Sequence, residues 1–172
     1  MHLPPFQHLI DAHWREVARL AWALAGPVDG DDVAQQAWLQ AYAAYPRLSS
    51  AANLRGWLLT ITHRCAMDRH RARARHPVPV PDEALLGPTL LGTGLFGANA
   101  VAPHTELPDA ELPDTELWSR VAALPERQRQ AVTLRFVGDL DHATIAAMLD
   151  TTPTMSRRLV SDALAALRRN IA

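Results

Sequence analysis

The sequence has no lysine and a single cysteine, Cys65. One cysteine cannot form an intramolecular disulfide, and no cluster of thiols is present to make a zinc site of the usual kind. No apolar run reaches the roughly 20 residues needed to cross a bilayer, and the N-terminus has no basic stretch followed by a continuous apolar region. We therefore expect a soluble, cytoplasmic protein without membrane insertion.

Sequence motifs of catalytic sites are missing as well. The chain has no Gly-rich phosphate loop, no GxSxG elbow and no HExxH pair, and its histidines do not follow metal-ligand spacing. Asp31 and Asp32 are adjacent carboxylates, but the start of a helix explains them, because its dipole favours negative charge. We expect neither an enzyme nor a bound cofactor or metal.

Charge is distributed unevenly along the chain, although the formal net charge is only −1. All 17 basic residues are arginine. Residues 1–46 carry −3, residues 47–76 carry +6, residues 77–118 carry −7 without a single base, and residues 119–172 carry +3. Sign asymmetry on this scale indicates local partners of opposite charge.

The first 75 residues show the three- and four-residue apolar spacing of helices. The spacing predicts a helix over residues 6–25 that Gly26-Pro27 ends, and a second that Asp29 caps and Pro46 stops. A third follows over residues 54–75. Its expected buried side consists of Leu54, Trp57, Leu58, Ile61 and Cys65.

The remainder of the chain divides into a linker and a second helical segment. Residues 77–115 are acidic and rich in proline and glycine, which predicts a flexible linker. Two short helices ended by Pro125 and Gly138 should follow, and then two helices around a tight turn, as in a helix-turn-helix. The expected apolar positions of that pair are Ile145, Ala146 and Leu149, then Val160, Leu164, Leu167 and Ile171. We predict an all-α fold with small helical domains at 1–76 and 116–172.

Arginines form a stripe on the third predicted helix. Arg64, Asp68, Arg71 and Arg75 share one face opposite Ile61, and His63, Arg69 and Arg73 widen that face. Such a stripe can neutralise several phosphates. The charges alone fit a solvated basic face equally well. However, an ordinary exposed helix would interleave acids at i±4, and only Asp68 is present, which favours phosphate binding.

Aromatic side chains and the last helix offer further candidates for nucleic-acid contact. Trp38 and Trp57 lie on apolar faces and are expected in the core, whereas Tyr42 and Tyr45 could either be buried or stack on unpaired bases. In the helix-turn-helix, the candidate phosphate and base-edge donors are Ser156, Arg157, Arg158 and Ser161. Many helical hairpins bind nothing, so this motif gains weight only beside the first basic surface.

Three stretches, taken together, resemble bacterial sigma factors. Residues 31–42 read DDVAQQAWLQAY and look like the second conserved region of that family. Residues 57–75 read WLLTITHRCAMDRHRARAR and match a helix of the same region, while residues 124–149, LPERQRQAVTLRFVGDLDHATIAAML, resemble the fourth region. The order is right and the intervening third domain is missing, which is the layout of the extracytoplasmic-function group.

The resemblance implies a subunit that binds core RNA polymerase and directs it to particular promoter DNA, with an anti-sigma factor as a further candidate partner. The residues expected to dock on the β′ clamp are Asp31, Asp32, Gln35 and Gln36. Those expected to engage the −10 element, by receiving a flipped base or holding the melted strand, are Ser50, Asn53, Arg55, His63, Arg64, Arg71 and Arg75. Those expected to read the −35 element are Thr154, Arg157, Arg158 and Ser161, while residues 126–137 would face the β flap.

Several residues depart from the family pattern. Arg64 stands where many members have Asn, Thr154 where the turn often has Gly, and Asp162 where Arg is common. Thr144 stands where a glutamate usually precedes Ile-Ala, and Ser156 stands where the register set by Leu149 and Leu164 requires an apolar residue.

Two rival functions remain open at this stage. One is a helix-turn-helix transcription regulator that binds duplex DNA as a dimer without core polymerase. The other is a helical adaptor that binds only protein, for which the arginine stripe would be a solvated face.

Overall fold

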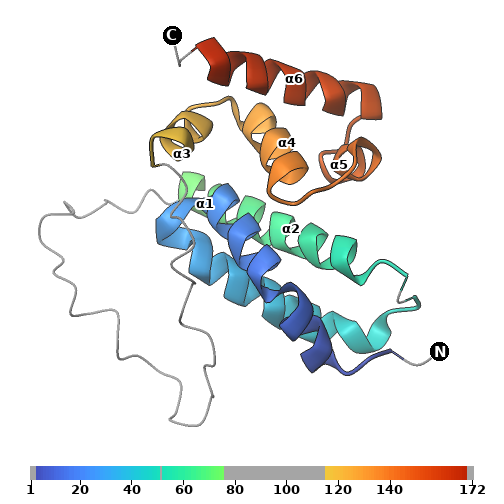
Figure 1. Cartoon of the computed structure of the whole chain (residues 1–172). Helices are drawn as coiled ribbons and strands as arrows, with labels where there is room; N and C mark the ends of the chain where they lie inside the picture. Colours follow the sequence, from blue (N-terminus) through green and yellow to red (C-terminus); the bar gives the residue numbers. More distant parts are fainter. Residues whose placement is uncertain (1–2, 51, 76–114, 170–172) are drawn as a thin grey trace, which may run out of the picture.

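The computed structural model describes residues 3–50, 52–75 and 115–169, and all regular structure in them is helical. The elements are α1 (Phe6–Ala44), the 3-10 helix η1 (Tyr45–Arg47), α2 (Leu54–Arg75), α3 (Thr115–Ala122), α4 (Glu126–Phe136), α5 (His142–Met148) and α6 (Pro153–Arg169) (Figure 1). The all-α prediction is confirmed. The acidic linker lies, apart from Thr115, outside the described residues, as does Ile171.

A sharp kink at Gly26 divides α1 into two halves. Gly26 has φ 80° and ψ 178°, a conformation that residues with a side chain rarely adopt, and Pro27 then starts the second half. The predicted helix end is therefore confirmed. Asp29 is not the cap of the second half, because it lies inside that half with its side chain buried.

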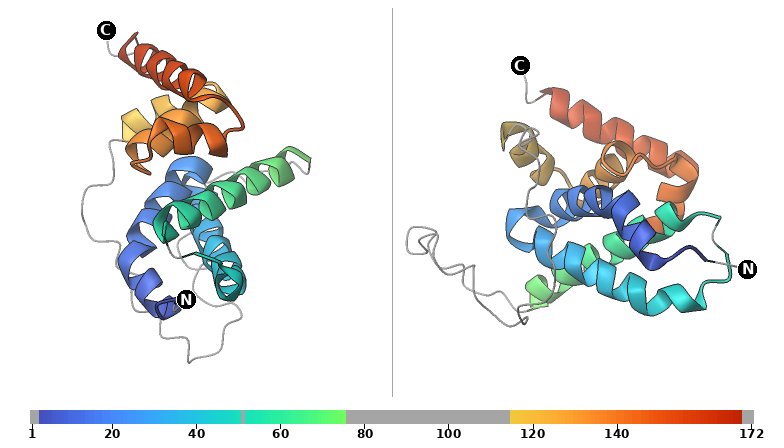
Figure 2. Two further views of the ribbon diagram at one scale, coloured as in Figure 1. Left: turned by 90° about the vertical axis from the view of Figure 1, so that its right-hand side faces the viewer. Right: turned by 60° about the horizontal axis from the view of Figure 1, so that its bottom comes forward.

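The two halves of α1 run back along each other and form a three-helix bundle with α2 (Figures 1 and 2). At the open end of this hairpin, the ring of Phe6 lies 5.1 Å from that of Tyr45 and 6.1 Å from that of Trp38. Tyr45 is core and donates its hydroxyl to the Pro4 carbonyl at 2.6 Å, whereas Tyr42 is 66% exposed. Of the two tyrosines that could be either buried or free to stack on bases, Tyr45 is buried and Tyr42 is exposed.

Helix α2 has the bounds that its apolar spacing predicts. Leu58, Ile61 and Cys65 are buried, and Leu54 and Trp57 are half-buried against the same core. Burial raises the pKa of the Cys65 thiol, with a further increase from the negative charge of Asp68, so this thiol stays protonated and unreactive at neutral pH.

The C-terminal helices form a second unit with its own small core. Buried Val121 of α3 and Val132 of α4 pack with Ala163 and Leu167 of α6. The predicted end of α4 at Gly138 is confirmed, and glycine is required there because a Cβ atom would lie 2.8 Å from the Leu134 carbonyl oxygen. The left-handed residue at this turn is Asp139, with φ 45°.

The second unit lies directly on the first. Helix α4 contacts α1, and α5 contacts α2, so that buried residues of both units form one continuous apolar cluster (Figure 2). Members from the second unit include Leu134, Ile145 and Val160. The face of α1 and α2 that the second unit covers is consequently withdrawn from solvent.

Candidate nucleic-acid interface

Three arginines of α2 form the exposed part of the stripe. Arg64, Arg71 and Arg75 are exposed, whereas Ile61 and Cys65 of the same helix are buried. Arg71 pairs with Asp68 at 3.2 Å, but both side chains are about two-thirds exposed, at 69% and 67%, so water weakens this pair. All three guanidinium groups are accessible to a phosphate backbone.

The other two arginines of the stripe are engaged by acids of α1. Asp29 is 2% exposed and accepts from Arg69 Nε at 2.8 Å and from Arg73 Nη1 at 2.6 Å. Arg69 also reaches Asp32 at 3.2 Å. The prediction that the stripe lacks counter-charge beyond Asp68 is therefore wrong, because acids distant in the sequence pair with two of its five arginines. The other three arginines remain accessible.

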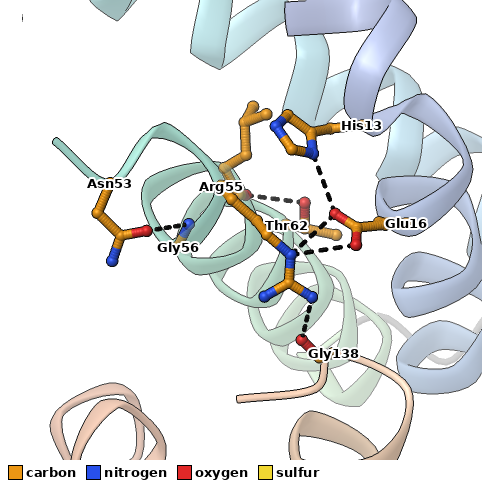
Figure 3. A network of polar contacts seen from close by, with 8 residues as sticks. His13, Glu16, Asn53, Arg55, Gly56, Thr62 and Gly138 are labelled. Atoms are coloured by element: carbon orange, nitrogen blue, oxygen red, sulfur yellow. Dashed lines mark hydrogen bonds and ion pairs between the residues drawn. The ribbon is translucent and has the colours of Figure 1, made fainter. Parts of the chain in front are cut away.

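The loop before α2 carries the predicted residues Ser50 and Asn53, both exposed. Asn53 caps the helix, because its Oδ1 accepts from the backbone N–H of Gly56 at 2.9 Å (Figure 3). Ser50 Oγ accepts from the N–H of Ala52 at 3.2 Å. Each side chain uses an acceptor to shape the loop and still presents its remaining polar atoms to solvent.

Arg55 is half-buried and His63 is buried in this structure, in contrast to the rest of the predicted −10 set, which is exposed. Arg55 donates from Nε to both carboxylate oxygens of Glu16 at 3.1 Å, and from a terminal nitrogen to the Gly138 carbonyl at 2.8 Å (Figure 3). His63 is 6% exposed, under Gln130 of α4. The second unit therefore covers both residues.

The predicted −35 residues lie together on the outer side of α6. Thr154, Arg157, Arg158 and Ser161 are exposed, while Val160, Ala163 and Leu167 face inward. Arg158 lies 3.8 Å from Asp162, a loose and exposed contact that leaves its guanidinium accessible. The start of α6 can thus present hydroxyl and guanidinium donors to a major groove.

Ser156, considered as a phosphate donor in the sequence, is instead fully buried. Its Oγ lies 3.1 Å from Nδ1 of His142, the first residue of α5. Ser156 is therefore excluded from DNA contact in this structure. The hydroxyl of Ser156, at a position where an apolar residue is expected, has a hydrogen-bond partner on α5, the first helix of the helix-turn-helix.

The departure at Thr144 has a local explanation. Asp141 caps α5 and accepts from the backbone N–H groups of Ala143 at 2.8 Å and Thr144 at 3.0 Å, and the Thr144 hydroxyl adds a third bond to the same carboxylate. These bonds, the Thr144 backbone bond first, lower the pKa of Asp141. The helix start is thus fixed without a glutamate.

The arginines of α4 serve the fold of the second unit. Arg127 donates to the Leu149 carbonyl at 2.7 Å, Arg129 to Ala122 at 3.0 Å and Arg135 to Leu140 at 3.1 Å. Two of these acceptors lie at the ends of α5 and α3, where cations are favoured. The positive balance of residues 119–172 is therefore partly structural.

The outer face of the second half of α1 carries the predicted polymerase-docking set. Asp31, Asp32, Gln35 and Gln36 are exposed. Asp31 accepts from Trp22 Nε1 at 2.7 Å. Beside them, Leu39 is 59% exposed and lines two shallow grooves with Gln35. Polar residues around exposed apolar ones are typical of a protein-binding surface.

Sequence reasoning missed the residues that position the predicted ones. Glu16, Asp29, Gln130 and Gly138 each engage a basic side chain of α2 from another element. They lie far from α2 in the sequence, so no local pattern indicates them. Only the observation that some basic side chains of α2 are not fully exposed could have indicated that they have partners. No group of three or more metal-binding side chains occurs among the described residues, and none of their helices is long and apolar enough to span a membrane.

Comparison with known proteins agrees with this arrangement. The family model described as Sigma-70 region 2 matches residues 9–76, and that of Sigma-70 region 4 matches residues 114–167. The fold is similar to the sigma factor RpoE from Bartonella quintana, solved with the anti-sigma factor NepR, at 17% identity and TM-score 0.72 over 97% of this chain and 96% of that one. It is also similar to CnrH, solved with the cytosolic domain of CnrY, at 19% identity and TM-score 0.63 over 96% of this chain and 86% of that one. Since the two regions together span more than half of its length, the chain belongs to the sigma-70 family.

Proposed function

We propose that this sigma factor binds core RNA polymerase and directs promoter-specific initiation, with a domain of residues 1–76 engaging the −10 element and a domain of residues 116–172 engaging the −35 element. The observation that carries the proposal is a pair of separate, exposed guanidinium sets. One lies on α2 and the other at the start of α6, and each helix is fixed by a buried apolar side.

The exposed arginines of α2 suit a separated strand. Removing bases from a duplex costs a few kcal/mol per base, so a protein that melts DNA needs contacts that the separated strand alone can make. Arg64, Arg71 and Arg75 supply cations for its phosphates, and the free polar atoms of Ser50 and Asn53 lie in the loop that leads into the same helix.

The outer face of α1 suits the polymerase. Asp31, Asp32, Gln35 and Gln36 would form the polar part of the contact with the β′ clamp, and exposed Leu39 would supply apolar area beside it. On α4, Phe136 is 61% exposed and offers an apolar contact for the β flap. An anti-sigma factor would bind this chain, as NepR binds RpoE in the similar complex.

Runoff transcription with purified core polymerase over genomic fragments tests the proposal. We expect promoter-specific transcripts that require both core and this chain. The triple variant Arg64→Ala, Arg71→Ala, Arg75→Ala and the double variant Arg157→Ala, Arg158→Ala should each reduce the yield at least tenfold. Arg15→Ala with Arg19→Ala is the matched control, because these arginines are exposed on α1 and outside both sets.

The rival functions predict different results in transcription, DNA-binding and oligomeric-state measurements. A dimeric regulator would bind duplex DNA specifically without core and would run as a stable homodimer. A protein-binding adaptor would keep its activity in the triple variant. A complete lack of core binding, together with no promoter-specific transcript from any fragment, would falsify the proposed function.

A further inference from the structure

Met155 is an exposed apolar side chain in the first turn of α6. It is 41% exposed, and among the described residues of this helix it is the only large apolar side chain that is exposed. Its backbone position is fixed, because its N–H donates to the Thr152 hydroxyl at 3.2 Å and the next residue, Ser156, is buried. An apolar side chain is therefore held at the end of α6 that carries the candidate base contacts.

Asp162 places a carboxylate on the same helix. Its side chain is 50% exposed, and its Oδ2 lies 3.8 Å from Nε of Arg158, which is too long for a hydrogen bond. A carboxylate on a surface that meets phosphates weakens binding by repulsion of like charges. Its presence at the expected DNA surface is favourable only where the DNA offers a hydrogen-bond donor.

These residues share one edge of α6. Met155, Arg158 and Asp162 follow at i, i+3 and i+7 and form a row, the α6 row, on a side of the helix away from the buried Val160. The row is about 10 Å long at the helical rise, or about three base-pair steps of 3.4 Å. Helix α6 lies on the side of the second unit that faces away from α1 and α2, so the row is accessible (Figure 1).

The three side chains match three groups of the major groove. A guanidinium group binds O6 and N7 of guanine, a carboxylate accepts from N4 of cytosine, and an apolar side chain packs on the C5 methyl group of thymine. A G·C pair presents the first two groups side by side. The loose contact between Arg158 and Asp162 leaves both side chains available for them.

We propose that the α6 row determines part of the promoter sequence that this chain selects. Arg158 and Asp162 bind the guanine and the cytosine of one base pair, and Met155 contacts the methyl group of a thymine in the adjoining part of the site. The inference rests on the proposed function, which identifies the duplex as the −35 element. It adds Met155 and Asp162 to the residues that choose the sequence and gives the carboxylate a role that phosphate binding cannot explain.

Selection from a library of duplex promoter fragments, randomised upstream of the −10 element, tests the proposal with the complete chain bound to core polymerase. We expect wild type to select a G·C pair and a thymine within about three base pairs of it. Asp162→Ala should reduce the preference for the G·C pair about five- to tenfold, and Met155→Ala should remove only the preference for thymine. Arg168→Ala, exposed in the last turn of α6, is the matched control and should leave both preferences unchanged.

Replacing the selected thymine by uracil tests the contact with Met155 without changing the protein. The replacement removes only the C5 methyl group and keeps the base pair. We expect the affinity of the wild-type complex for the fragment to fall about fourfold, the effect of one buried methyl-sized group. The Met155→Ala complex should bind the thymine and uracil fragments equally. An equal loss in wild type and Met155→Ala would assign the methyl group to another residue and overturn this contact.

Asp162→Ala separates base reading from simple repulsion. If the carboxylate only repels phosphates, the variant binds every fragment more tightly and its sequence preference stays the same, which would overturn the role of Asp162. Transcription by the wild-type chain with core polymerase is scored separately. Promoter-specific transcripts with unchanged preferences in both variants would leave the proposed function standing and reject the row. Selection of the same bases by the chain without core, together with no transcript, would keep the row and reject the proposed function.

Discussion

Arg73 donates to the buried carboxylate of Asp29 at 2.6 Å, across 44 residues of sequence. This bond, together with that from Arg69, fixes the C-terminal end of α2 to the second half of α1. It separates the arginines of α2 into two classes, those that hold the bundle and those that remain for a ligand.

Asp29→Asn should destabilise the N-terminal bundle. Hydrogen bonds to charged groups contribute about 1.5–3 kcal/mol each, and the half-exposed arginines reduce this through solvent screening, so we expect a loss of about 1–3 kcal/mol in the free energy of unfolding. Urea denaturation measures it. Asp11→Asn, exposed on α1, should change stability by less than about 0.5 kcal/mol, and equal effects of the two substitutions would contradict the assignment.

The exposed arginines of α2 should determine the salt dependence of single-strand binding. Each phosphate contact contributes about 0.7 to the slope of log affinity against log salt for single strands, so Arg64→Ala, Arg71→Ala, Arg75→Ala should reduce the slope by about 2. A slope unchanged from that of the parent protein would show that these guanidinium groups do not touch phosphate.

The closed state, in which α4 packs over His63 of α2, should become less stable in acid relative to an open state with the two units apart. Burial lowers the pKa of His63 below its usual value of about 6.5, opposed by the Gln130 hydrogen bond and assisted by the positive charges of Arg64 and Arg71. Well above pH 6.5 the imidazole is neutral in both states, and pH has no effect through it. As the pH falls below that value, the open state takes up a proton that the closed state does not, so the equilibrium shifts towards opening until the lowered pKa is passed.

The distance between nitroxide labels at Ala43→Cys on α1 and Ala165→Cys on α6 measures this shift when it is followed from about pH 8 to pH 5.5. His63→Gln keeps a hydrogen-bonding side chain and removes the titration, so its distance should not respond to pH over the same range. An equal response in His63→Gln would assign the effect to another group.

Thr133→Val should stabilise the protein. The Thr133 hydroxyl is buried without a hydrogen-bond partner among the described residues, and an unsatisfied buried polar group costs about 1–3 kcal/mol. We expect the free energy of unfolding to rise by about 1 kcal/mol. Thr62→Val is the control, because that buried hydroxyl donates to the Leu58 carbonyl at 3.0 Å and should not gain. Destabilisation of similar size in both variants would show that Thr133 has a partner.

Local sequence signals predicted the helices well. Apolar spacing gave the bounds of α2, and proline and glycine gave the ends of α3, α4 and the first half of α1. These features depend on neighbouring residues, on the backbone preferences of Gly26 and Pro125, and on the close approach of the backbone at Gly138.

Pairings between distant residues could not be predicted in the same way. The sequence gives the spacing of Arg69 and Arg73 on a helix, but not that Asp29 would lie under both. Nor does it indicate that Gln130 would cover His63, because the contact between the two units depends on a surface assembled from four helices. The sequence therefore allowed the residues of the candidate site to be named. Which of them are accessible could be determined only from the tertiary structure.

The hydrogen bond between Ser156 and His142 has a consequence for how α6 is oriented. Apolar packing alone tolerates small rotations of a helix about its axis. A buried hydroxyl with one hydrogen-bond partner keeps that bond only over a narrow range of helix rotation. Turning α6 by one residue would bring Arg157 into the core position and leave the imidazole of His142 without its partner. The bond thus favours one rotation of α6 about its axis, and with it the set of side chains, Arg157 among them, that faces outward.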